Sequence, residues 1–214
     1  MEIVLVALIG LALGAGSFYL SGSMIRKRTG ELASGLLFGT KRGWAVWMSL
    51  GTIAGILIGS FNGLNEKGLE MLLVFLIITC LSAVDQSIRK IPNELLAALL
   101  MLKIAVMTLQ GNSGDMKLAL IGMVFGFAIF TAPSLLKIGI GSGDIKYGAV
   151  AGFYLGIYGV LQSVAIMSIV LGIYSLYLYI AKRGDLKTKV PMGPSFSLGF
   201  FSAVLFPAVS ILLK

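Results

Sequence analysis

The sequence predicts an all-α membrane protein, a polytopic helix bundle, and three observations support this. Hydrophobic residues make up 57% of the 214 residues, and the mean hydropathy is +0.98. Charged residues make up only 12%, less than half the roughly 25% of an average soluble domain. The apolar residues form long runs, not the alternating segments of about ten residues that a membrane barrel needs. Because lipid offers no hydrogen bonds, the backbone in such runs is expected to be helical.

Several apolar stretches are long enough to hold membrane helices. They cover residues 3–20, 44–60, 69–84, 95–109, 118–136, 145–181 and 196–213. As one helix, residues 145–181 would be about 55 Å long, nearly twice the roughly 30 Å of the hydrocarbon core. This stretch is therefore either one overlong span or two short spans that meet near Gly159.

The distribution of the 17 Lys and Arg residues favours two spans in that stretch. With a break near Gly159 the chain has about eight transmembrane helices, and both of its ends lie outside. Most basic residues then fall in cytoplasmic loops, as the positive-inside rule requires. They are Arg26, Lys27, Arg28, Lys41, Arg42, Arg89, Lys90, Lys137, Lys146, Lys182, Arg183, Lys187 and Lys189. We therefore expect a multi-pass protein of the cytoplasmic (inner) membrane, folded as one domain over residues 1–214.

The net charge of +8 indicates a partner for these loops. Because the basic residues are spread over several short loops, we expect them to contact membrane lipids with anionic headgroups and no nucleic acid.

The residue types present restrict the chemistry that the chain can perform. Histidine is absent and Cys80 is the only cysteine. Ser-His and Cys-His catalysis, histidine-ligated metals and cysteine zinc sites are therefore excluded. Any reaction must use carboxylates, lysines, hydroxyls or a bound cofactor, and we expect neither a metal nor a cofactor.

Two acids, Asp85 and Asp144, are the candidate catalytic residues. In the predicted topology Asp85 ends one span and Asp144 precedes another, so both lie at the cytoplasmic face. Acids beside a membrane span are candidates for function, although a single one is as often a solvated helix end. Asp144 follows Gly139, Gly141 and Gly143, which permit positive φ angles and close backbone approach. The alternative for this segment is a flexible turn.

A pair of carboxyl groups that share a site can act as acid and base. Two such groups do not both ionise readily, so one stays protonated and the other charged. This pair can activate water and protonate the amide leaving group of a peptide. Neither a nucleophilic side chain nor a metal is needed.

Two stripes of glycine at every fourth position are predicted to be close contacts between helices. One is formed by Gly51, Gly55 and Gly59, and the other by Gly148, Gly152 and Gly156.

Four segments resemble, in order, the motifs of type IV prepilin peptidases, a family of GxGD membrane aspartyl proteases. GSGDIK at residues 141–146 is similar to the motif of the second catalytic aspartate. VDQSIRKIPN at residues 84–93 is similar to that of the first. GSF at residues 16–18 and VPMGP at residues 190–194 resemble two further segments of the family.

The resemblance implies a function and a set of site residues. The substrates would be type IV prepilins or pilin-like pseudopilins of pilus assembly and protein secretion. Their short basic leader peptide would be cut at the cytoplasmic membrane face. Asp85 and Asp144 would be catalytic. The residues expected to bind substrate or shape the site are Gly141, Gly143, Lys146 and Pro92.

One departure from the family bears on a second activity. Bacterial members commonly carry a cytoplasmic domain with two CxxC pairs, linked to zinc and to N-methylation of the product. Here residues 21–43 form only a short basic loop without cysteine. We therefore expect no methylation.

Two other functions remain open from the sequence. A small ion- or proton-coupled transporter could use Asp85, Asp144 and Lys103 to line a path. Lys103 could equally extend its ammonium group to the membrane surface. A structural scaffold would need neither acid.

Overall fold

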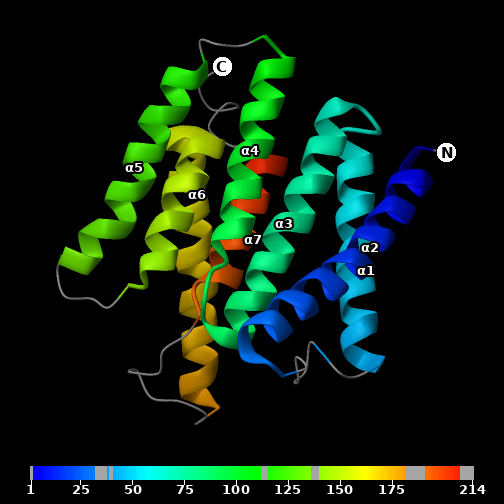
Figure 1. The fold of residues 1–214 in the computed structure, drawn as a ribbon, viewed down its shortest axis with the longest axis horizontal. Helices are drawn as coiled ribbons and strands as arrows, with labels where there is room; N and C mark the ends of the chain where they lie inside the picture. Colours follow the sequence, from blue (N-terminus) through cyan, green and yellow to red (C-terminus); the bar gives the residue numbers. More distant parts are fainter. Residues whose placement is uncertain are drawn as a thin grey trace. The chain divides into compact units, whose positions relative to one another are not determined.

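The computed structural model describes residues 2–31, 38, 41–111, 115–135, 140–181 and 191–207. These residues form seven helices and no strand, which confirms the predicted all-α class (Figure 1). The helices are α1 (Glu2–Thr29), α2 (Lys41–Phe61), α3 (Glu66–Ile88), α4 (Asn93–Leu109), α5 (Asp115–Leu135), α6 (Ser142–Ile180) and α7 (Gly193–Leu205). They divide into two compact units, Met1–Leu102 and Lys103–Lys214. The expectation of one domain stays a prediction.

Five of the helices in the described part of the chain are long and apolar enough to cross a membrane: α1, α2, α3, α5 and α6. Their length and composition support a membrane-embedded protein with several spans. Helices α4 and α7 are shorter, with 17 and 13 residues. The count of eight spans and the outside position of the N-terminus stay predictions.

In the first unit, α1 and α2 pack backbone against backbone. A β-carbon on Gly10 would collide with the carbonyl oxygen of Gly51, and one on Gly51 would collide with that of Gly10. Farther along, a β-carbon on Gly55 would lie 2.6 Å from the Val6 carbonyl oxygen. The predicted stripe on α2 is thus a helix contact, and its partner stripe on α1 includes Gly10 and Gly14.

In the second unit, the other predicted stripe makes the same kind of contact. A β-carbon on Gly152 of α6 would collide with the carbonyl oxygen of Gly122 on α5. One on Gly126 of α5 would collide with the carbonyl oxygen of Gly148. Because glycine has no side chain, the two backbones approach closely here, and this holds the first part of α6 against α5.

Helix α6 is broken at Gly156, where φ is 71° and ψ is −178°. Positive φ is readily adopted only by glycine. In Figure 1 the chain folds back here, so residues 142–155 and 157–180 run in opposite directions. At 1.5 Å per residue the two parts are about 21 Å and 36 Å long. The sequence predicts a break near Gly159, and the break falls three residues earlier, at the glycine that has the positive φ.

Candidate active site

Asp85 lies in the last turn of α3 and is only 6% exposed. The helix stops at Ile88 because Arg89 turns into the left-handed conformation, with φ 51° and ψ 40°. The backbone N–H of Arg89 donates to the carbonyl oxygen of Asp85 at 2.8 Å. The acid is therefore buried at the end of an apolar helix, and the interpretation as a solvated helix end is wrong for Asp85.

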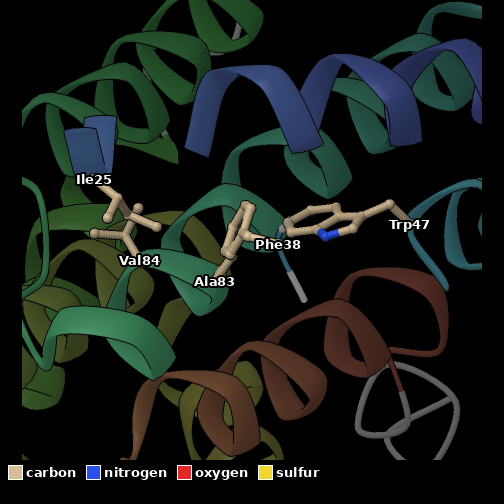
Figure 2. Close-up of a cluster of buried hydrophobic side chains, with 5 residues drawn as sticks. All are labelled: Ile25, Phe38, Trp47, Ala83 and Val84. Atoms are coloured by element: carbon tan, nitrogen blue, oxygen red, sulfur yellow. The ribbon is translucent and has the colours of Figure 1, made fainter. Parts of the chain in front are cut away.

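Buried apolar side chains hold this end of α3 in place. Ala83 and Val84, directly before Asp85, pack with Ile25 of α1, Trp47 of α2 and Phe38 (Figure 2). All five are less than 5% exposed. The turn that carries Asp85 therefore has little freedom to rotate.

The GSF segment supports the same helix. The hydroxyl of Ser17, which is fully buried, shares a hydrogen bond of 3.1 Å with the hydroxyl of Thr79 on α3. The ring of Phe18 lies 5.7 Å from that of Phe38 and 6.4 Å from that of Trp47, between ring centroids. This segment therefore packs against the helix that carries Asp85 and helps to fix its position.

The segment after Asp85 joins α3 to α4. Pro92 is buried, and its carbonyl oxygen accepts the N–H of Leu96 at 3.3 Å. Arg28 of α1 forms an ion pair of 2.7 Å with Glu94 in the first turn of α4. A hydrogen bond from its own backbone N–H, followed by the charge of Arg28, lowers the pKa of the Glu94 carboxyl. Pro92 therefore lies in a short turn between two fixed points. The hydrogen bond from Arg89 to Asp85 closes α3 before it, and the Arg28–Glu94 ion pair holds the start of α4 after it.

Asp144 lies in the first turn of α6 and is half-buried. The carbonyl oxygen of Gly141 accepts the N–H groups of Asp144 at 3.0 Å and Ile145 at 3.3 Å. A β-carbon on Gly141 would lie 3.0 Å from a carboxylate oxygen of Asp144. The carboxyl group thus folds back over Gly141, at a helix N-terminus where a negative charge is favoured.

The conformation of Gly141 shows why glycine is present there. Its φ of −68° and ψ of 143° are open to any residue. Of the two reasons for glycine that the sequence allowed, close approach applies and positive φ does not.

The other predicted site residues of α6 lie in its first two turns. Gly143 is half-buried, and Lys146 is exposed. Their roles stay predictions.

Sequence reasoning missed Tyr147 and Ser197. Tyr147 follows Asp144 by three residues and is 1% exposed. Its hydroxyl shares a hydrogen bond of 2.9 Å with that of Ser197 on α7. Helix α7 begins within the VPMGP segment, of which residues 191–194 are described and Val190 lies outside the described residues. The helical spacing from Asp144 was the only signal in the sequence.

Lys103 belongs to the second unit and is half-buried. Its ammonium nitrogen is 5.0 Å from the centroid of the Tyr154 ring, a cation–π distance. The side chain therefore contacts another helix of the protein, α6.

The predicted site residues fall into the two units. Asp85 and Pro92 belong to the first unit, and the remaining four to the second: Gly141, Gly143, Asp144 and Lys146. Their pairing into one site stays a prediction.

Residues 70–176, half of the chain, match the model of the type IV leader peptidase family. The chain belongs to this family. The match runs from α3 into the second part of α6 and so includes all six predicted site residues. It excludes the GSF and VPMGP segments. No curated protein and no solved structure matches the chain. Membership confirms the resemblance and supports a protease of the leader peptidase type.

Proposed function

We propose that this protein is a membrane aspartyl endopeptidase with Asp85 and Asp144 as its catalytic pair. It removes the short basic leader peptide of type IV prepilins or pilin-like proteins at the cytoplasmic face of the inner membrane. The burial of Asp85 at the end of an apolar helix carries the proposal. A carboxyl group is costly in such a place and marks a functional site. Family membership supplies the reaction type.

The environment of Asp144 also supports the proposal. The space above Gly141 and the position at a helix N-terminus suit a carboxylate that must reach a water molecule. No histidine competes for these roles, since the chain has none.

The proposed reaction needs one proton shared between the two carboxyl groups. The charged group takes a proton from water as the water oxygen attacks the peptide carbonyl carbon. The protonated group then gives its proton to the amide nitrogen, and the C–N bond breaks. One group again holds a proton at the end, so the pair can begin another cycle.

The test is to replace each acid by asparagine. Asp85→Asn and Asp144→Asn should each lower cleavage of a prepilin-type substrate at least about 10³-fold, since the amide can neither accept nor supply the required proton. Membrane abundance should stay near that of the natural protein. Glu66→Gln is the matched control, because Glu66 is an exposed acid at the other end of α3.

Full cleavage by either asparagine variant would remove that residue from the mechanism. The transporter alternative gives a different result in the same experiment. It predicts an ion flux in reconstituted vesicles that depends on the acids, with no cleavage by the natural protein.

A further inference from the structure

Tyr147 is the buried polar residue nearest in sequence to Asp144 on α6. Residues three apart lie on the same side of a helix. The direction in which Tyr147 points is therefore tied to the direction in which Asp144 points. Its side chain is 1% exposed, and that of Ser197 on α7 is 4% exposed. The 2.9 Å hydrogen bond between their hydroxyl groups is therefore buried.

Aromatic contacts surround this hydrogen bond. The Tyr147 ring meets the Phe196 ring edge-on, with centroids 4.8 Å apart. Phe196 meets Phe130 of α5 in the same way at 4.9 Å. A β-carbon on Gly148 would collide with the Phe130 ring. The start of α6 thus packs against α7 through Tyr147 and against α5 through Gly148.

The apolar and glycine contacts differ from the hydrogen bond in how strictly they fix the rotation of α6. Apolar contacts and glycine contacts set the distance between helices and restrict their rotation, but they are not directional in the way that a hydrogen bond is. A buried hydrogen bond has a narrow range of length and angle, and breaking it leaves buried polar groups without partners. It therefore favours one rotation of the helix.

We propose that Tyr147, through Ser197, is a positioning residue for the carboxyl group of Asp144. The hydrogen bond sets the rotation of the first turns of α6 and so the place of the Asp144 side chain. This inference rests on the proposed peptidase function. Helix α7, which holds Ser197, begins within the VPMGP segment, and this segment lies outside the family match.

The experiment measures kcat and KM separately, with the full-length protein in vesicles and a prepilin-type substrate. A displacement of about 0.5 Å at Asp144 corresponds to about tenfold in rate, given about 10²-fold for 1 Å. Tyr147→Phe and Ser197→Ala should each lower kcat by about that factor and leave KM nearly unchanged. The double variant should be no slower than either single variant, because each substitution removes the same hydrogen bond.

Three further measurements separate positioning from general packing. Ser197→Thr keeps the hydroxyl and should retain most of kcat. Tyr158→Phe is the matched control on the same helix, since Tyr158 is 56% exposed, and it should behave as the natural protein. The pH profile of kcat should shift in Tyr147→Phe, because moving Asp144 changes its interaction with the second carboxyl group.

Each outcome has a distinct meaning. If the natural protein cleaves the substrate and Tyr147→Phe is equally active, the positioning role alone is overturned. The same holds if Tyr147→Phe only lowers the amount of folded protein while kcat and the pH profile stay as before. If the natural protein itself does not cleave, the proposed function fails and the positioning role falls with it.

Discussion

Replacing Gly141 with alanine is expected to slow cleavage without destabilising the protein. The backbone angles at Gly141, φ −68° and ψ 143°, suit alanine. Alanine is a poorer N-cap than glycine by roughly 0.5–1 kcal/mol. It also restricts the unfolded chain, which stabilises the fold by about 0.4–1 kcal/mol. The two terms offset each other, so stability should change by less than about 1 kcal/mol.

The effect on the reaction follows from one distance. The new β-carbon would lie 3.0 Å from the Asp144 carboxylate oxygen, whereas ordinary contact begins at 3.4 Å. The carboxyl group must therefore move by about 0.4 Å. If a displacement of 1 Å lowers the rate about 10²-fold, one of about 0.4 Å lowers it about sixfold.

The assay compares kcat per folded protein in three variants of the second unit. Gly141→Ala should be about sixfold slower at normal abundance. Gly172→Ala, within α6, should match the natural protein because nothing lies within 4 Å of the new β-carbon. Gly152→Ala should lower abundance, since its β-carbon would collide with the α5 backbone. An unchanged kcat in Gly141→Ala would refute the argument, as would a loss explained entirely by less folded protein.

Three further predictions concern topology, metal dependence and methylation. Lys67 and Lys90 lie exposed near opposite ends of α3; in a Cys80→Ser background, Lys67→Cys should react with an impermeant maleimide in intact cells and Lys90→Cys only after permeabilisation. The reverse result would invert the predicted orientation. Without the cysteine and histidine ligands that zinc prefers, cleavage should persist in a metal chelator. The product incubated with S-adenosylmethionine should keep an unmodified amino terminus, and a gain of one methyl mass would reveal a second activity.

Sequence patterns predicted most of the helices and several of their contacts. Long apolar runs correspond to α1, α2, α3, α5 and α6. The glycine stripes on α2 and α6 were correctly identified as contact faces. The break in α6 was predicted to within three residues, because a helix of that length exceeds the bilayer and glycine is the residue that permits a reversal.

The environment of Asp144 was predictable only in part. The alternation of glycines before it indicated an unusual backbone or a close approach, but these two could not be distinguished. The structure shows that the Asp144 carboxylate itself occupies the space above Gly141. This depends on a side-chain conformation, which the order of residues does not reveal.

Local properties of the chain, namely its hydropathy, glycine spacing and motif residues, determined the helical membrane class, the family and the choice of acids. Those properties depend on neighbours in sequence. Tertiary structure alone decided that Asp85 is buried, that Gly122 faces Gly152, and that Tyr147 bonds to Ser197. Each of these depends on which face of one helix meets a helix distant in sequence, and apolar surfaces on all sides of a membrane helix leave that choice open until the helices pack.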